Sequence, residues 1–247
     1  MNAARSPEVS ALIWQLVTPC PGLPVDFLSS EATDGFLAEL SEFRGRILYA
    51  NGRRPRFARE GGRFADDDPL DLESFHVTVR SEGALIGCVR LTPLPEYSRS
   101  FIGQRIGPSS LEAVVKRLKL ARTDCVEAGR WIVAPEARGT ELGRTLLLSL
   151  WVVGELLDKR CVFGAVGMRD GQSTLVSRCG GLVAPGIDPL FVQEFDDELS
   201  LMYFDLNHPP PRIAIQLARV RRILNLPGET NRQSVDQVEQ GVADLCA

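Results

Sequence analysis

Apolar residues recur along the chain with two spacings, one typical of helices and one typical of strands. Between residues 29 and 52 they fall on one helical face, and this predicts a helix that ends near Gly52. Shorter apolar runs bounded by Gly, Pro or Asn predict strands. The further predicted elements are strands at residues 11–19, 126–135, 160–167 and 199–206, and helices at residues 109–121, within 172–186, at 213–224 and from residue 143 onward.

A β-hairpin is predicted at residues 74–95, where two β-rich runs flank a turn at residues 81–83. Its second strand is expected to end near Arg90. Ser109 and Glu112 match a capping box, which predicts that the next helix begins there.

Residues 126–144 hold the most informative pattern, a predicted strand followed by a tight turn with glycines and a predicted helix. The strand carries Glu127 and Arg130. This order places backbone N–H groups and the positive end of a helix dipole just beyond the strand, where they suit a phosphate. A phosphate-linked substrate is therefore expected.

Residues 53–71 are polar and predict a long loop, and long loops in compact domains are either functional or mobile. Five arginines are followed by an acidic cluster. These residues are Arg53, Arg54, Arg56, Arg59 and Arg63, then Asp66, Asp67, Asp68 and Asp71.

The composition is that of an ordinary globular protein, with 44% hydrophobic and 24% charged residues among 247. We predict one domain at residues 1–208, followed by a C-terminal helix and polar tail at residues 209–247. A net charge of −4 argues against nucleic acid as the partner. The two histidines and six cysteines lack ligand spacing, so no metal site is predicted. Neither a signal pattern nor a membrane span is recognised, which predicts a cytoplasmic protein.

The segment VAPEARGTELGRTLL resembles the acyl-donor motif of the GNAT acyltransferase superfamily, Arg/Gln-x-x-Gly-x-Gly/Ala. Arg138 matches its first position and Gly143 its last. The resemblance implies an α/β (α+β) GNAT-like three-layer fold, with a mostly antiparallel mixed sheet splayed at the acyl-donor strand and helices on both faces. It also implies that Arg138, Gly139, Gly143 and Arg144 bind the phosphopantetheine arm of acyl carrier protein or coenzyme A. The alternative is an ordinary turn without a ligand.

Four more motifs, FRGRIL, DPLD, IGCVRLTP and EAGRWIV, occur in the order seen in autoinducer (acyl-homoserine lactone) synthases and the similar N-acyl amino acid synthases. The resemblance covers about residues 36–205. The chain departs from the autoinducer synthases at Leu48, where they usually carry Phe, and it lacks the Trp that follows. Both aromatics belong to their S-adenosylmethionine site, so N-acyl amino acid synthases are the better match.

A further departure is Glu141, which replaces the middle glycine of the donor motif. Its carboxylate would repel the pyrophosphate of coenzyme A. This favours a donor with one phosphate, such as acyl carrier protein, which the arginine-rich loop and the basic tail helix would attract.

The resemblance gives roles to residues of the strand. Glu127 is the candidate base or base-orienting group, beside Arg130, and the N–H groups around Ile132 and Val133 are candidate oxyanion donors. Side chains alternate along a flat strand, so Glu127 and Arg130 share a face only if a β-bulge lies between them. Alternatively, the two form a structural ion pair that anchors the loop.

Arg44, Asp68, Asp71 and Arg90 are candidates for binding an acceptor that carries an amine and a carboxylate. Alternatively, Arg44 pairs with Asp68 or Asp71 to hold the loop against the helix, and Arg90 has the same two interpretations. Both roles are compatible. A set of apolar residues lines an acyl pocket or forms plain core: Leu146, Trp151, Val162 and Phe163.

The predicted function is N-acyl transfer from acyl carrier protein or acyl-CoA to the amine of an amino acid or derivative, with acyl-phosphopantetheine as co-substrate and no tightly bound cofactor. One alternative is an acyl-homoserine lactone synthase that uses S-adenosylmethionine. The other is a non-catalytic GNAT-like domain that senses or binds acyl carriers. Oligomeric state and the identity of the acceptor are left open.

Overall fold

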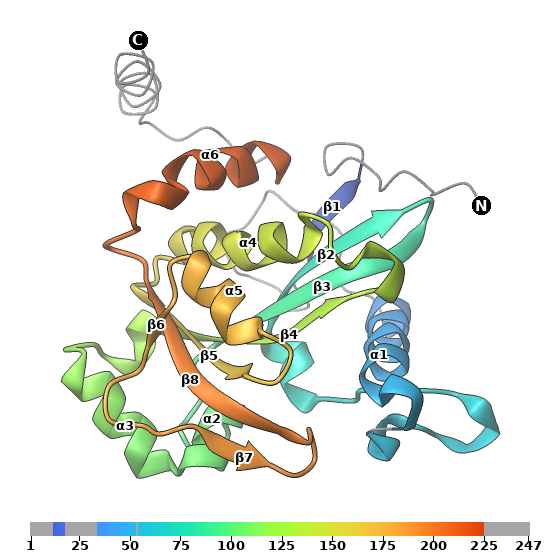
Figure 1. Ribbon diagram of the computed structural model, residues 1–247, viewed down its shortest axis with the longest axis horizontal. Helices are drawn as coiled ribbons and strands as arrows, with labels where there is room; N and C mark the ends of the chain where they lie inside the picture. Colours follow the sequence, from blue (N-terminus) through green and yellow to red (C-terminus); the bar gives the residue numbers. More distant parts are fainter. Residues whose placement is uncertain (1–11, 18–33, 53, 225–247) are drawn as a thin grey trace.

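The structure, a computed structural model, describes residues 12–17, 34–52 and 54–224 (Figure 1). The predicted first strand is described as β1, and part of its predicted range lies outside the described residues. So do Arg53 and the polar tail from residue 225 onward.

The described strands form one mixed, mostly antiparallel sheet in the order β1-β2-β3-β4-β5-β8-β6, with β7 also paired to β8. Only β4 and β5 run parallel among these pairs. The predicted fold class is confirmed. The strand bounds are β1 Ile13–Val17, β2 Phe75–Ser81, β3 Ala84–Pro93, β4 Cys125–Val133, β5 Cys161–Gly167, β6 Leu182–Val183, β7 Leu190–Val192 and β8 Asp197–Asp205.

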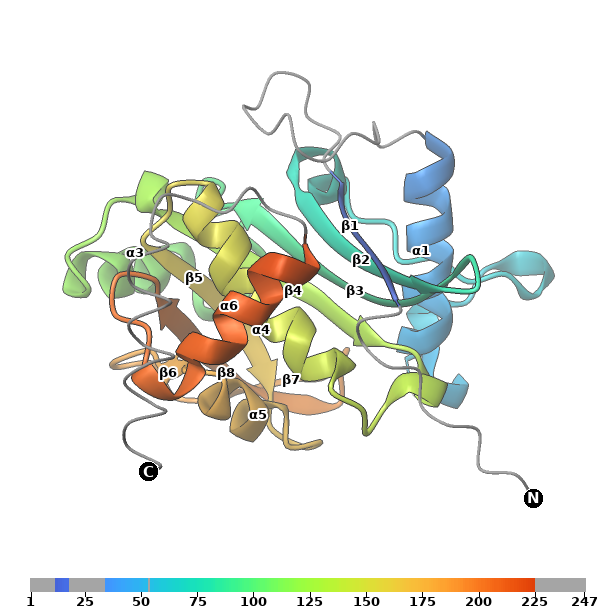
Figure 2. The ribbon, with the colours of Figure 1, turned by 90° about the horizontal axis from the view of Figure 1, so that it is seen from above.

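Helices cover both faces of the sheet, as Figures 1 and 2 show. Helix α4 lies against one face with α6 outside it, and α1, α2 and α3 lie on the other side. The helix bounds are α1 Asp34–Tyr49, α2 Phe101–Ile106, α3 Pro108–Arg117, α4 Leu142–Leu156, α5 Gln172–Arg178 and α6 Ala214–Ile223.

The alternation of side chains along the central strands explains why the sheet has a hydrophobic core on each face. Val126 and Val162 join the core that contains the apolar face of α4, whereas Cys125 and Cys161 join the core beneath α2 and α3. Successive side chains of a strand point to opposite faces, so two neighbouring residues serve two cores. The continuous apolar run of β5 is therefore typical of a sheet that is covered on both sides.

Three predictions about local structure need correction. Strand β3 extends to Pro93 instead of ending near Arg90, because its pairing with β4 continues to Pro93. Helix α3 begins at Pro108 after Gly107, and no side-chain cap bond is present, so the predicted Ser109 capping box is wrong. The six-residue α2, which is too short for a periodic signal, was missed.

The sheet opens between β4 and β5. They pair from Cys125 with Cys161 to Ala128 with Gly164, and beyond that point β4 continues only alongside β3. The β3–β4 register shifts between Cys88 and Arg90, opposite Arg130, whose φ is 55°. The predicted bulge and splay are therefore both present.

Helix α1 approaches the following loop most closely at Gly45, where an added Cβ would lie 2.4 Å from the backbone nitrogen of Ala65. Because backbone does not yield as a flexible side chain does, Gly45→Ala is expected to lower the unfolding free energy by about 1–3 kcal/mol in urea denaturation. Gly143→Ala is the control, since its Cβ would meet Trp131 at 3.5 Å and helix propensity favours Ala by up to about 1 kcal/mol. Unchanged stability of Gly45→Ala would contradict the close approach.

Candidate active site

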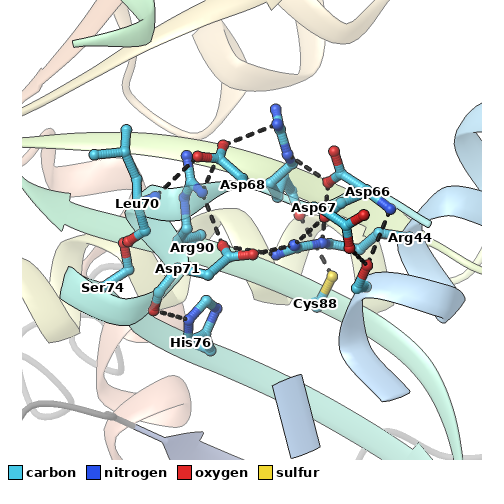
Figure 3. Close-up of polar contacts among 12 residues, drawn as sticks. Arg44, Asp66, Asp67, Asp68, Leu70, Asp71, Ser74, His76, Cys88 and Arg90 are labelled. Carbon is cyan, nitrogen blue, oxygen red and sulfur yellow. Dashed lines mark hydrogen bonds and ion pairs between the residues drawn. The ribbon is translucent and has the colours of Figure 1, made fainter. Parts of the chain in front are cut away.

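Three arginines from three elements converge on three aspartates of the loop (Figure 3). The arginines come from α1, β3 and β4, and the aspartates lie just before and within the short 3-10 turn that precedes β2. We call this set the ion-pair network: Arg44, Arg90, Arg130, Asp66, Asp68 and Asp71.

Arg44 is the fully buried member of the network, with 0% of its surface exposed. Its Nε lies 3.1 Å from Asp66 Oδ2, its Nη1 donates to Asp71 Oδ1 at 3.0 Å, and its Nη2 donates to the Asp66 carbonyl oxygen at 2.9 Å and also pairs with Asp71 Oδ2. The predicted loop-holding role is therefore present, with Asp71 and Asp66 as the partners of Arg44.

Arg90 and Arg130 complete the network. Arg90 Nη1 lies 2.8 Å from Asp68 Oδ2 and 2.8 Å from Asp71 Oδ1. Arg130 Nε lies 2.6 Å from Asp66 Oδ2, and its Nη2 lies 2.9 Å from Asp68 Oδ2. Each carboxylate thus faces two guanidinium groups.

Asp66 belongs to the acidic cluster but was not among the predicted site residues. The extended chain turns Asp66 and Asp68 inward, while the side chain of Asp67 is 71% exposed between them. Successive side chains of an extended backbone point to opposite sides, so this alternation is expected. The sequence did not indicate whether Asp67 alone or the pair Asp66 and Asp68 faces inward.

The network sets the protonation states of its members. Burial raises the pKa of Asp71, but Arg44 and Arg90 outweigh it and hold that pKa below its ordinary value. Burial alone would lower the pKa of Arg44, but the carboxylates of Asp71 and Asp66 outweigh burial and raise this pKa above its ordinary value. Nearby Cys88 has a pKa raised to about 12 by burial, and burial lowers the pKa of His76 to about 4. Cys88 is therefore a thiol and His76 a neutral ring at neutral pH.

Acid is expected to destabilise the protein through Asp68 and Asp71, whose pKa values lie below the ordinary 3.8 in the folded state. A lowered carboxyl pKa gives stability above the unfolded pKa, and this stability is lost as pH falls through the folded pKa. The urea midpoint should therefore fall as the pH is lowered below the ordinary carboxyl pKa of 3.8. Asp67→Asn, as an exposed control, should keep this acid limb. A midpoint independent of pH there would contradict the ionised network.

Glu127 lies on β4 with only 2% of its surface exposed. Ser100 Oγ donates to Glu127 Oε2, and the backbone N–H groups of Phe101 and Ile102 also donate to this carboxylate. Burial raises the pKa of Glu127, against these donors and the charge of Arg90. A buried carboxyl with a raised pKa is suited to accept a proton near neutral pH.

Glu127 and Arg130 do not form the alternative structural pair. Among the described residues, the ion pairs of Arg130 go to Asp66 and Asp68, whereas Glu127 is held by the start of α2. Ser100, the N-cap of α2, was missed because its only sequence signal is a serine before a short apolar run.

A cavity of about 180 Å³ begins at Glu127 and crosses the sheet through the opening between β4 and β5. Glu127 and Phe101 line it on the α2 side. Leu147, Val162 and Met202 line it on the α4 side. The cavity therefore joins a buried carboxyl group to an apolar chamber under α4.

The residues predicted to line an acyl pocket divide into two groups. Val162 and Phe163 line this cavity. Leu146 and Trp151 are fully buried in the core cluster and are not among the lining residues. Two of the four are therefore core.

A groove of about 1090 Å³ lies beside the turn that leads into α4. It is lined by the predicted donor residues Arg138, Gly139, Gly143 and Arg144. Gly139 has a φ of 76°, a left-handed conformation that suits glycine. The first amides of a helix have no upstream carbonyl to bind, so this end of α4 favours an anion.

Trp131 connects the groove and the cavity, because it lines both. Its Nε1 donates to the carbonyl oxygen of Gly143 at 3.1 Å, which ties β4 to the first turn of α4. Of the two candidate oxyanion donors, Ile132 lines the cavity and Val133 lines the groove. The strand thus carries both residues to the place where the two spaces approach each other.

In the part of the chain that the structure describes, no group of His, Cys, Asp and Glu is arranged to hold a metal ion. Nor is any described helix long and apolar enough to cross a membrane.

Residues 38–157 match the model of the acetyltransferase (GNAT) family. The match includes the ion-pair network, Glu127 and the turn before α4. This match supports acyl transfer as the general chemistry of the site. No curated protein matches the chain by sequence.

Solved structures with the same fold include acyl-homoserine lactone synthases. The CoA-dependent synthase BjaI with MTA is 14% identical, with a TM-score of 0.60 over 93% of this chain and 99% of that one. The CoA-dependent synthase MesI is 16% identical, with a TM-score of 0.56 over 88% and 97%. LasI, an AHL synthase, is 14% identical, with a TM-score of 0.55 over 82% and 93%. At identities this low, the TM-scores establish a common fold and nothing more specific. The resemblance to autoinducer synthases is confirmed at the level of the fold.

Proposed function

We propose that the protein is an N-acyltransferase that moves a fatty acyl group from acyl carrier protein, or from acyl-CoA, to the amine of an amino acid or derivative. One observation carries the proposal. A cavity with Glu127 on one side of the sheet and an apolar chamber on the other meets, at Trp131, a groove beside the turn before α4. A thioester at that meeting point has room for its acyl chain, its carrier arm and an amine.

The donor lies in the groove in this proposal. Its phosphate binds at the N-terminal end of α4 with Arg138 and Arg144, and Gly139 and Gly143 allow the carrier arm a close approach. The carboxylate of Glu141 lies 3.9 Å from Arg144 Nη1 and is largely exposed, so it adds negative charge at the same place. This supports acyl carrier protein, with its single phosphate, over coenzyme A.

Acyl transfer begins when the neutral amine attacks the thioester carbonyl carbon. The amine proton passes to Glu127, directly or through one water, and the carbonyl oxygen takes the negative charge while N–H groups near Ile132 and Val133 bind it. Collapse of this intermediate forms the amide and breaks the C–S bond. The proton on Glu127 then returns to the departing thiolate, so the carrier leaves as a thiol.

The acceptor meets Arg90 and Arg130 in this proposal, because these two members of the network line the cavity. Arg44, Asp68 and Asp71 hold them in place, and Asp68 and Asp71 fix the charge that the arginines present. In this proposal the same ion-pair network therefore holds the loop and presents Arg90 and Arg130 to the acceptor.

Purified protein incubated with acyl carrier protein thioesters, acyl-CoA and a panel of amino acids tests the proposal. Thiol release that depends on an amino acid, with an N-acyl product in mass spectrometry, is the expected result. Absence of amine-dependent thiol release with every donor would overturn it. Carrier binding without turnover would favour the non-catalytic sensor.

The second candidate is an acyl-homoserine lactone synthase, and the common fold with BjaI, MesI and LasI favours it. S-adenosylmethionine as acceptor distinguishes the two, because only lactone formation releases methylthioadenosine. Its release in the same assay would decide for this candidate.

A further inference from the structure

Ser100 contacts Glu127 without lining the cavity. Its surface is fully buried, and it is not among the described residues that line the cavity, whereas Glu127 is one of them. The hydroxyl group of Ser100 donates to Glu127 Oε2, and the two residues are 27 apart in the sequence. A residue in this position influences the reaction through Glu127 and not by touching a substrate.

The backbone around Ser100 holds its hydroxyl group in one orientation. The N–H of Ser100 donates to the carbonyl oxygen of Glu96 at 3.0 Å, and its own carbonyl oxygen accepts the N–H of Gln104 at 2.9 Å. Its Oγ accepts the N–H of Gly103 at 3.1 Å. Because this bond occupies one lone pair of the hydroxyl oxygen, the hydroxyl hydrogen is left to bond Glu127.

Helix α2, which begins after Ser100, is anchored by contacts with the segment between β7 and β8. Arg105 pairs with Glu194, and the ring of Phe101 packs edge to face on the ring of Phe195, with 5.8 Å between the centroids. The groups that donate to Glu127 therefore belong to an element that packing holds in place. Such support keeps a reacting group in its productive geometry.

The side chains that surround Glu127 make its bond to Ser100 important. Its cross-strand neighbours are Thr92 on β3 and Phe163 on β5, and neither titrates near neutral pH. The arginines of β3 and β4 near Glu127 belong to the ion-pair network, where aspartates balance their charge. Burial raises the pKa of Glu127, and the Ser100 hydrogen bond is the largest influence that lowers it.

We propose that Ser100 is a positioning residue for acyl transfer, whose hydroxyl group holds Glu127 ionised and in place to accept the proton of the amine. This inference rests on the proposed function, and it adds a residue that lies outside the sequence motifs that indicated the fold. A hydrogen bond donated to a carboxylate favours its charged form. Loss of the hydroxyl group should therefore shift the ionisation of Glu127 to higher pH.

The pH dependence of kcat in Ser100→Ala tests the inference. The rising limb should move up by about one pH unit or more, because a hydrogen bond to a charged group is lost. Below the limb, kcat should fall about tenfold for each unit of this shift. KM for the donor and for the amine should change less than about twofold, because Ser100 does not line the cavity.

Three further variants separate this role from the role of Ser100 as the N-cap of α2. Ser100→Gly lacks the hydroxyl group, but glycine is tolerated at an N-cap, so it should show the same shift as Ser100→Ala. Ser100→Thr keeps a hydroxyl group and should restore the wild-type limb. Ser98→Ala is the control, since Ser98 is exposed on the same segment, and it should behave as wild type.

An NMR titration of the Glu127 carboxyl carbon, assigned with Glu127→Gln, measures the shift without turnover. An unmoved titration in both Ser100→Ala and Ser100→Gly would overturn the inference. So would a loss of kcat that is equal at every pH, or one that Ser100→Thr does not restore. Absence of amine-dependent thiol release in the wild type would instead overturn the proposed function, and the NMR titration distinguishes the two failures.

Discussion

Asp71→Asn is expected to lower the unfolding free energy by about 3–5 kcal/mol, because it removes one partner from buried ion pairs. Asp71 bonds both Arg44 and Arg90, whose exposed fractions are 0% and 2%. An asparagine of nearly the same shape leaves both buried guanidinium groups without part of their counter-charge. The loss of stability arises because Arg44 and Arg90 become buried charges that are only partly compensated. It does not require that the original ion pairs contribute much net stability.

Urea denaturation of Asp71→Asn beside Asp67→Asn measures this effect. Asp67 is four residues away in the same acidic cluster, and its side chain is 71% exposed while it pairs with Arg59 at 3.3 Å. Exposed pairs of this kind contribute roughly 0–1 kcal/mol, so this control should unfold close to wild type. Similar losses in the two variants would show that the buried network is not what holds the loop.

Glu127→Gln is expected to reduce kcat for acyl transfer by about 10²- to 10⁴-fold, the usual contribution of a positioned general base. The amide keeps the shape of the carboxyl group and can accept the hydrogen bond of Ser100, so the fold should be retained. Because burial disfavours the charged form of Glu127 and raises its pKa, removing this charge is not expected to destabilise the fold, and the melting temperature should stay close to wild type. The loss of rate is then chemical rather than structural.

The pH profile separates a base from a residue that only binds. A base acts when deprotonated, so the wild-type rate should rise with pH through the raised pKa of Glu127, and this limb should be absent in Glu127→Gln. Glu112→Gln, on the exposed face of α3 beside Lys116, serves as the control and should keep the full rate and the limb. Nearly normal turnover by Glu127→Gln would remove Glu127 from the base assignment.

The strand, turn and helix at residues 126–144 were predictable because each signal lies within a few residues. The apolar residues of this segment predict a strand, and Gly139 and Gly143 mark the turn before α4. The bulge was expected on the condition that Glu127 and Arg130 share a face, as the resemblance implied, because residues three apart in a flat strand point to opposite sides. The wrong start of the next helix also has a local cause, because Gly107 and Pro108 start α3 in place of a serine cap.

The composition of the site was predictable, but its pairing was not. Arg44, Asp71 and Arg90 were all identified as candidates, while the inward turn of Asp66 was not. Arg44 and Asp71 are 27 residues apart, so the contact depends on how closely the loop packs on α1 at Gly45. A pattern within one segment carries no information about that distance.

The sequence by itself determined the longer strands and helices, although not α2, β6 or β7, and through motif order it indicated a GNAT-like acyltransferase. The tertiary structure alone decided that Ser100 holds Glu127 and that Arg54 meets Phe195, 141 residues away. It also decided that the opening beyond Ala128 becomes a cavity between two cores. Periodicity and turn chemistry act between neighbours in the chain, whereas these contacts exist only after distant segments pack together and exclude water.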